Sequence, residues 1–479
     1  MKKILVVLLL AFLVLQSCHR ERNQKSLEVV ILHTNDMHGA IDGFAKIAAL
    51  RDSLLEVHEH LLIISAGDLF SGNPVVDYFE PKGYPMIDLM NDVGYDLTVI
   101  GNHEFDYGQD ILQERIEQAS FPFICANMNT ANTIMSQPNP FHVCKIEDIE
   151  LFFLGLLEIG NQGRPSTHPA KLEGISFDDP VETAGRFIGK KKDYNAFIAL
   201  SHLGWQADER LANTYGEFDV IIGGHSHSLI DSTLIRNGVL IAQANDDLDY
   251  AGIIRLAFHK GELVKKSAEV INLRDYKKED EEILAKINQY NNNKSLNQVI
   301  GFAASDMRGK EELGALFTDA QTSMSGLDFA FQNNGGIRVY EIPQGEISAK
   351  TVYTMDPFGN ELMEFSLRPE EIKSLLSYAY NRYQHPGLQI SGGSYTINVD
   401  KNSEIQNIQI YDEHGEILHA DSTYSVGLSS YIASSYQFEH QDKGKSHYRT
   451  TAENIIAYIE QKDTVDYAGV RRVFVDTVP

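Results

Sequence analysis

Five short polar motifs lie along the chain's first half, and each follows an apolar run of the length expected for a buried strand. The motifs are Asp36–His38, Gly67–Asp68, Gly101–Glu104, Ser201–His202 and Gly224–His227. The runs before them are Val29–Leu32, Leu61–Ile64, Leu97–Ile100, Ala196–Leu200 and Val220–Ile222. Because the carboxyl ends of strands in an open α/β sheet converge on one crevice, we expect these motifs to meet at a single site.

Helical stretches alternate with these strands, which extends the prediction to a whole domain. They are expected at Phe44–Leu55, Tyr84–Asp92, Gln109–Gln118 and Val181–Lys192. Such alternation is typical of an α/β domain, which is predicted for residues 27–273.

A polar stretch at residues 274–294 separates this domain from the rest of the chain. Its apolar residues Ile283, Leu284, Ile287 and Tyr290 recur at helical spacing, so a connecting helix is predicted. Residues 295–479 mix helical and strand patterns and predict a second α/β domain. The elements expected there are helices Glu311–Met324 and Pro369–Tyr380 and strands Phe329–Gln332, Glu361–Leu367, Ser394–Val399 and Ile405–Tyr411.

The N-terminus has the pattern of an export signal. Lys2 and Lys3 precede the twelve-residue apolar run Ile4–Leu15, which is short for a membrane-spanning helix. Leu15–Cys18 then resembles a bacterial lipobox, with cleavage before Cys18 and a lipid on that cysteine. The expectation is a signal peptide at 1–17, a tether at 18–26 and an exported lipoprotein, periplasmic or at the cell surface. A plain secretory signal is the alternative.

Charge and cysteine content narrow the possible partners and compartments. A net charge of −26 disfavours binding to nucleic acid backbones, so no nucleic acid partner is expected. Cys125 and Cys144 could form a disulfide in an exported protein or lie as separate buried thiols, and the sequence leaves both possibilities open.

The five motifs contain the donor types needed to bind two divalent metal ions. Such a site holds the ions about 3.5–4 Å apart and clamps both oxygens of a phosphoryl displacement. Asp36 and His38 leave one strand end and can reach the same ion, and Asp68 is the natural bridge between the ions. The candidate ligands are Asp36, His38, Asp68, Asn102, His202, His225 and His227. This mixture suits zinc, manganese, iron or a similar metal, and the acidic stretch Asp246–Asp249 is expected at the surface instead.

In order and context, the motifs resemble those of the bacterial 5′-nucleotidase and UDP-sugar hydrolase family, over nearly the whole chain after the signal. The resemblance implies an N-terminal calcineurin-like metallophosphatase domain, an α/β/β/α sandwich, followed by a second α/β nucleotidase domain. It also implies a ligand set for each ion: Asp36, His38, Asp68 and His227 for the first, and Asp68, Asn102, His202 and His225 for the second. Some relatives have Gln at the position of His227, a difference that bears on metal preference.

Asn102–Asp106 matches the family's Asn-His-Glu-Phe-Asp motif. His103 is therefore expected to be catalytic, since an imidazole can stabilise charge on the transferred phosphate or assist the leaving oxygen. Asp106, three residues later, is expected to orient His103.

Two segments of the second domain match substrate-binding positions of the family. Asn333–Arg338 supplies glycines and an arginine, and Asp356–Asn360 supplies an aromatic ring beside an amide. The resemblance implies that arginines bind the phosphate or carbohydrate and that aromatic rings stack on the base. The residues carried over are Arg308, Arg338, Phe358, Asn360 and Tyr431. Relatives follow the second aromatic with Gly-Gly-Asp, which is absent after Tyr431, and Tyr436 is an alternative stacking partner.

Together these features predict a metal-dependent 5′-nucleotidase that cleaves nucleoside 5′-monophosphates by attack of a metal-bound hydroxide. A UDP-sugar or nucleotide pyrophosphatase and a 2′,3′-cyclic nucleotide phosphodiesterase are alternatives on the same fold. A non-catalytic, nucleotide-binding surface lipoprotein is the alternative from a different class.

Overall fold

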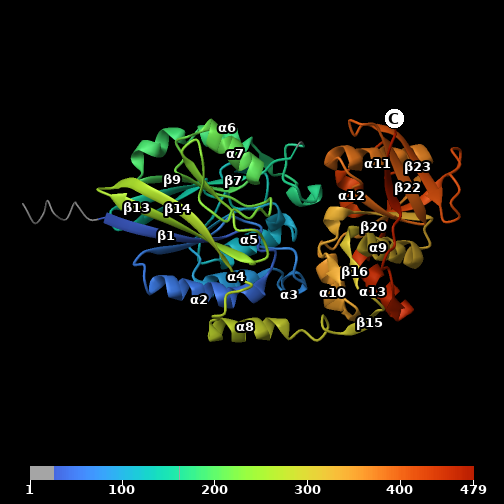
Figure 1. Ribbon diagram of the computed structural model, residues 1–479, viewed down its shortest axis with the longest axis horizontal. Helices are drawn as coiled ribbons and strands as arrows, with labels where there is room; N and C mark the ends of the chain where they lie inside the picture. Colours follow the sequence, from blue (N-terminus) through green and yellow to red (C-terminus); the bar gives the residue numbers. More distant parts are fainter. Residues whose placement is uncertain (1–25, 161, 479) are drawn as a thin grey trace, which may run out of the picture. The chain divides into compact units, whose positions relative to one another are not determined.

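The computed structural model describes residues 26–160 and 162–478, which divide into two compact units (Figure 1). The first unit contains the chain up to Phe70, Phe79–Thr167 and Lys171–Asn291. The second contains Ser71–Tyr78, His168–Ala170 and the chain from Asn292 onward. The predicted signal peptide and Cys18 lie outside the described residues. Within the described ranges, no helix is both long enough and apolar enough to cross a membrane.

The first unit is built on two six-stranded sheets. The first sheet has the order β14 (Glu262–Asn272), β13 (Tyr250–His259), β1 (Ser26–Thr34), β2 (Leu61–Ser65), β3 (Leu97–Val99) and β4 (Phe123–Ile124). The second has the order β11 (Leu234–Arg236), β12 (Val239–Ala242), β10 (Val220–Ile222), β9 (Ala196–His202), β7 (Ile149–Leu157) and β6 (Phe141–Ile146). A small pair, β5 (Met128–Asn129) and β8 (Ser176–Phe177), lies apart from both.

Side-chain alternation along the strands builds the layers of this unit. On β9, Ile198 and Leu200 join the core shared by the two sheets, whereas Phe197 and Ala199 join a second core with residues of the helix α7 (Trp205–Thr214). A strand buried on both faces must be apolar at nearly every position, as β9 is. Helices therefore cover the outer faces and give the predicted α/β/β/α sandwich (Figure 1). They are α2 (Phe44–Leu55), α4 (Tyr84–Val93) and α5 (Gln109–Gln118) on one side and α6 (Pro180–Gly185) and α7 on the other. A further helix, α8 (Glu281–Asn291), packs on α2 and α4.

The sequence located the five motif-bearing strands correctly, but it misjudged one helix. The pairs β1–β2, β2–β3 and β9–β10 are all parallel, so within each sheet the motifs leave at the same edge. The single helix predicted at Val181–Lys192 is wrong, because α6 ends at Gly185 and a separate 3-10 segment covers Ile188–Asp193. Glycine weakens a helix interior, and Gly185 and Gly189 both fall inside the predicted span.

The second unit surrounds a five-stranded sheet with helices and smaller sheets. The five-stranded sheet has the order β21 (Leu388–Ser391), β17 (Phe329–Asn333), β24 (Tyr424–Ser429), β20 (Glu361–Leu367) and β25 (Lys445–Thr450). The smaller sheets are β23 (Ile405–Asp412), β22 (Gly393–Val399) and β27 (Val473–Thr477); β19 (Gly345–Ser348), β15 (Val299–Ala303) and β26 (Thr464–Val465); and β16 (Met307–Arg308) with β18 (Glu341–Ile342). The helices are α3 (Pro74–Asp77), α9 (Gly309–Ser325), α10 (Ala349–Met355), α11 (Pro369–Tyr383), α12 (Ser430–Ser435) and α13 (Thr451–Lys462).

The structure answers whether the two cysteines of the first unit are paired. Cys125 and Cys144 are both buried and free, so they form no disulfide in this structure.

Asp356, in the second unit, is 1% exposed and accepts a hydrogen bond from Thr451 Oγ1. Burial raises the pKa of Asp356 to about 7, so the folded chain retains a proton that a carboxyl of ordinary pKa releases near pH 4.

Replacing Asp356 with asparagine is expected to stabilise the protein at pH 8 more than at pH 5. When folding raises the pKa of a carboxyl, the free energy of unfolding falls as the pH rises from the pKa of the unfolded state to that of the folded state. The variant should remove up to about 4 kcal/mol of that fall. Thermal unfolding of both proteins at the two pH values measures the effect, and an equal difference at both would contradict it.

Candidate metal centre

The loops that carry the predicted ligands have an unusual backbone conformation. Five of the seven ligands have positive φ angles, a region that residues other than glycine rarely occupy. They are Asp36 (49°), His38 (46°), Asp68 (53°), His225 (76°) and His227 (52°). Such conformations persist only where surrounding contacts impose them, and they concentrate at functional sites.

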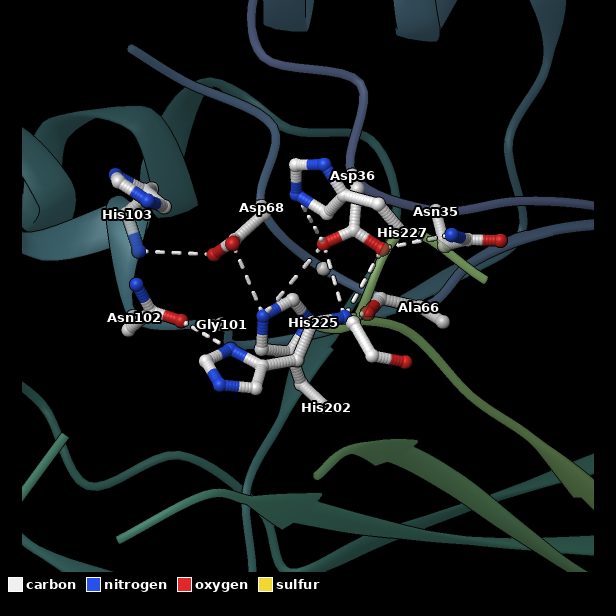
Figure 2. Close-up of polar contacts among 12 residues, drawn as sticks. Asn35, Asp36, Ala66, Asp68, Gly101, Asn102, His103, His202, His225 and His227 are labelled. Carbon is white, nitrogen blue, oxygen red and sulfur yellow. Dashed lines mark hydrogen bonds and ion pairs between the residues drawn. The ribbon is translucent and has the colours of Figure 1, made fainter. Parts of the chain in front are cut away.

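Asp36, His38 and His227 form the first cluster of candidate ligand atoms, all within 4.8 Å of one another. His38 Nε2 lies 3.1 Å from His227 Nε2. His227 Nε2 in turn lies 3.6 Å from Asp36 Oδ1 (Figure 2). His38 Nδ1 donates to the Phe70 carbonyl at 3.3 Å, and His227 Nδ1 lies 2.8 Å from Asp246 Oδ2. These partners place a proton on each Nδ1, so two Nε2 lone pairs face each other beside a carboxylate. A cation between them satisfies all three.

Asp68, His202 and His225 form the second cluster. His202 Nε2 lies 3.0 Å from Asp68 Oδ2, and His225 Nδ1 lies 2.9 Å from Asn102 Oδ1 (Figure 2). His202 Nδ1 donates to the Ala66 carbonyl at 2.8 Å, which again directs Nε2 into the site. Histidine ligands of metals usually donate their other ring N–H to a carbonyl or carboxylate, as His38, His202 and His227 do here.

His202 tests whether this donor set fits a cation. Its ring is fully buried, and Nε2 faces the Asp68 carboxylate, 3.0 Å from Oδ2. Burial alone would lower the pKa of His202, but the carboxylates of Asp68 and Asp36 raise it to about 10. The buried carboxylates thus favour a positive charge beside His202 Nε2, and mixed carboxylate, imidazole and amide donors suit a divalent transition metal.

Glu104 is a buried residue of the site that sequence reasoning did not single out. Its carboxylate accepts backbone N–H groups from Asp68 at 3.1 Å and Leu69 at 2.6 Å, and also from Gly101. It therefore holds the Asp68 loop to the Asn102 loop. A Cβ on Gly101 would lie 2.3 Å from Asp68 Oδ1, so only glycine fits there. The sequence signal for Glu104 was its place in the Asn-His-Glu motif.

His103 and Asp106 lie together at the edge of the second cluster. His103 Nδ1 lies 2.6 Å from Asp106 Oδ2, and Asp106 Oδ1 accepts a hydrogen bond from Thr167 Oγ1 at 2.8 Å. The His103 backbone N–H donates to Asp68 Oδ1 at 2.8 Å, and its ring lies edge-on to His38 with centroids 4.9 Å apart. The structure thus brings His103 next to the clustered ligands, with Asp106 fixing its ring.

Asp246 is partly exposed, in agreement with the surface position predicted for Asp246–Asp249, and it also contacts the candidate site. Its carboxylate contacts His227 Nδ1, and the Asp247 backbone N–H donates to the Asp36 carbonyl at 2.9 Å. Asn35, also missed, donates from Nδ2 to Asp36 Oδ2 at 2.7 Å and accepts the Ala244 N–H at 2.8 Å. The loop after β12 therefore contacts the residues of the first cluster and helps to fix their positions.

The candidate substrate residues all lie in the second unit. The Arg338 guanidinium lies over the Phe358 ring, 5.9 Å from its centroid. Asn360 is buried and its side-chain oxygen accepts from Ser430 Oγ at 3.2 Å, which places it beside Tyr431 at the start of α12.

Arg308 and the alternative ring Tyr436 have other surroundings. Arg308 is exposed and pairs with Asp306 at 2.8 Å and Glu341 at 3.1 Å. Tyr436 is buried at 5% exposure, so it packs in the core, with Tyr431 6.4 Å away between centroids. Of the two tyrosines, the partly exposed Tyr431 is the one available to a ligand.

Comparison with protein families shows which family the chain belongs to. The calcineurin-like phosphoesterase family matches residues 29–229, and the 5′-nucleotidase C-terminal domain family matches residues 291–438. The chain belongs to the 5′-nucleotidase family. This confirms the resemblance noted from the motifs, and members of the calcineurin-like family use divalent metals, in agreement with the clusters described above.

Individual relatives support the same conclusion. The chain is 28% identical over 486 residues to a 5′-nucleotidase of Vibrio cholerae, with 85% of each chain covered. A crystal structure of a 5′-nucleotidase precursor from Thermus thermophilus superposes with a TM-score of 0.83 and 26% identity, covering 95% of this chain and 100% of that one. A trifunctional nucleotide phosphoesterase of Bacillus subtilis is 25% identical over 464 residues, covering 85% of this chain. The chain spans 32% of that relative and 38% of an endonuclease from the same organism.

Proposed function

We propose that the protein is a phosphohydrolase that cleaves nucleoside 5′-monophosphates into nucleoside and phosphate with two divalent cations. The observation that carries this proposal is the pair of clusters that meet near Asp68, in a chain with both 5′-nucleotidase domains. Asp36, His38, Asp68 and His227 would hold one cation, and Asp68, Asn102, His202 and His225 the other. When bound, such a pair supplies an activated water and offsets charge on the phosphoryl oxygens.

The protein's own residues orient the phosphate and can supply a proton to the leaving group. Because Asp106 accepts from His103 Nδ1, the His103 Nε2 atom is presented to the reacting group. A protonated His103 can stabilise negative charge on the phosphoryl oxygens or donate its proton to the leaving 5′-oxygen. The Asp68 carboxylate, held by the His103 backbone N–H and the Glu104-bound loop, keeps its position during the reaction.

We further propose that residues 27–273 carry the cations and residues 295–479 recognise the nucleotide, joined by residues 274–294. Arg338 and Phe358, which already contact each other, suit a phosphate and a base, and Tyr431 supplies a second ring. Binding energy gathered from the nucleoside would serve to place the phosphate correctly. Arg308 would have to exchange its contacts with Asp306 and Glu341 for a substrate group.

A substrate panel tests the proposal directly. Chelated protein, with Mn²⁺ or Zn²⁺ added back, should release phosphate from AMP with a higher kcat/KM than it shows for UDP-glucose, 2′,3′-cyclic AMP or bis(p-nitrophenyl) phosphate. The chelated protein alone should be inactive, because the clusters then lack their cations. Preference for UDP-glucose or for cyclic AMP would favour the pyrophosphatase or the cyclic phosphodiesterase. Turnover of none would favour a nucleotide-binding lipoprotein.

Export and lipid anchoring at Cys18 are part of the same proposal. They rest on the Lys2–Cys18 sequence pattern. Mass spectrometry of the mature N-terminus in a bacterial host is expected to find a lipidated Cys18, and an unmodified N-terminus at another residue would contradict the anchor.

A further inference from the structure

A buried polar network lies behind the two histidine loops of the metal centre. Asp208 on α7 and Gln243, directly after β12, are both 0% exposed. Ser201 Oγ donates to Asp208 Oδ1 at 2.7 Å, and Gln243 Nε2 donates to Asp208 Oδ2 at 2.8 Å. Ser226 Oγ donates to Gln243 Oε1 at 2.9 Å. One carboxylate thereby connects three segments that are distant in sequence.

The ends of this network adjoin the proposed ligands. Ser201 directly precedes His202, and Ser226 lies between His225 and His227. The Trp205 backbone N–H at the start of α7 donates to Ser226 Oγ at 2.9 Å. Helix α7 therefore contacts the His225–His227 loop directly through Trp205 and indirectly through Asp208 and Gln243. These loops need such support, because the positive φ angles of His225 and His227 are not intrinsically favoured.

The network is also packed tightly against the backbone that leads to His225. A Cβ on Gly223 would lie 2.1 Å from Asp208 Oδ2 and 2.7 Å from Gln243 Nε2. The carboxylate therefore fills the space that a side chain at residue 223 would need. Because there is no free space around the Asp208 carboxylate, a shift of this side chain also moves the adjoining loop backbone.

We propose that Asp208 is a positioning residue of the metal centre, an inference that rests on the proposed function. Its carboxylate fixes the His202 loop through Ser201 and the His225–His227 loop through Gln243 and Ser226, in the geometry that binds cations. Outer partners of metal ligands typically contribute 10–100-fold to metal affinity or activity. Loss of the carboxylate would also leave the buried donors of Ser201 and Gln243 without their acceptor, which is costly in itself.

A donor and acceptor swap separates positioning from bulk stability. Asp208→Asn keeps the side-chain shape but offers one acceptor oxygen where the carboxylate offers two, so either Ser201 Oγ or Gln243 Nε2 then faces an amide N–H. In the double variant with Gln243→Glu, the new carboxylate accepts from that amide and from Ser226 Oγ. Ser201 can still donate to the remaining amide oxygen, so every hydrogen bond of the network is restored with the charge moved to residue 243.

Mn²⁺ affinity of the chelated full-length protein, measured by calorimetry, is the readout. Asp208→Asn is expected to weaken binding about 10–100-fold, and adding Gln243→Glu to return it close to wild type. Asp219→Asn is the control, since Asp219 accepts the Phe197 N–H at the opposite ends of β9 and β10. This control should keep wild-type affinity even if its melting temperature falls.

Two outcomes would overturn the inference: unchanged affinity in Asp208→Asn, or a double variant as weak as the single one. If Asp208→Asn does not fold, Ser201→Ala removes only the hydroxyl that contacts Asp208 Oδ1 and the Ile222 carbonyl, and it should still weaken Mn²⁺ binding measurably. Unchanged affinity there counts against the proposal. Wild-type protein that binds no Mn²⁺ would instead overturn the proposed function and this inference with it.

Discussion

Asp68→Ala is expected to lower phosphate release from AMP by at least about 10³-fold, the equivalent of about 4 kcal/mol of lost charge stabilisation. The physical reason is that Asp68 belongs to candidate groups on both sides of the site, with His38 and His103 in one and His202 and His225 in the other. Its removal takes a ligand from each proposed cation. Elemental analysis of the purified variant should therefore show a loss of bound metal.

Two companion variants sharpen this prediction. Asp96→Asn is the matched control, because Asp96 accepts the Ile63 N–H and precedes β3, whereas Asp68 and Asn102 follow β2 and β3. It should retain activity and metal. Gly101→Ala removes no ligand, but its new methyl group would meet Asp68 Oδ1, so it should impair metal binding in the same direction as Asp68→Ala. An Asp68→Ala protein with full metal content and wild-type turnover would exclude the bridging role.

His103→Ala is expected to reduce kcat by roughly 10²–10⁴-fold while leaving metal content unchanged, as loss of a positioned acid–base group usually does. The alanine retains the backbone N–H that donates to Asp68 Oδ1, so the ligand stays in place. Loss of activity with normal metal content distinguishes a catalytic imidazole from a structural one. Steady-state phosphate release at saturating AMP and Mn²⁺ gives kcat for the two proteins.

The neighbours of His103 provide graded controls for this experiment. Asp106→Asn should fall between wild type and His103→Ala, because the ring stays but loses its orienting carboxylate. Thr167→Val removes only the hydrogen bond to Asp106 Oδ1 and should have the smallest effect. If His103→Ala instead lost its bound metal, His103 would be a ligand, a role that its closeness to His38 and Asp68 also permits.

Strand ends and ligand types were predictable because both are local properties of the sequence. Runs such as Val220–Ile222 are apolar at every position, and the Gly-Gly-His turn follows at once, so strand and motif could be read together. Element bounds agreed closely at α2, α5 and β20, where periodicity is clear. Gly185 shows the limit, since a helical pattern that includes a glycine gave one helix where the chain forms two segments.

The supporting residues could not be predicted, because their roles depend on contacts across long stretches of chain. Asn35 accepts the Ala244 N–H, Asp246 contacts His227, and Asp208 accepts from Gln243. Each looks like an ordinary polar residue of a loop or helix surface in the sequence. For Asn35 and Asp208, burial decides the role, because an unpaired polar group away from water is costly and must find a partner.

Sequence patterns predicted the five motif-bearing strands, the kinds of candidate ligand side chain and their place at strand ends. Those features follow from side-chain polarity and spacing along the chain. The folded arrangement was needed to learn which lone pairs face each other, as at His38 and His227, and which buried carboxylate supports which loop, as at Glu104 and Asp208. The reason is that hydrogen bonds and charge contacts act over about 3 Å in space, a distance that spacing along the sequence does not specify.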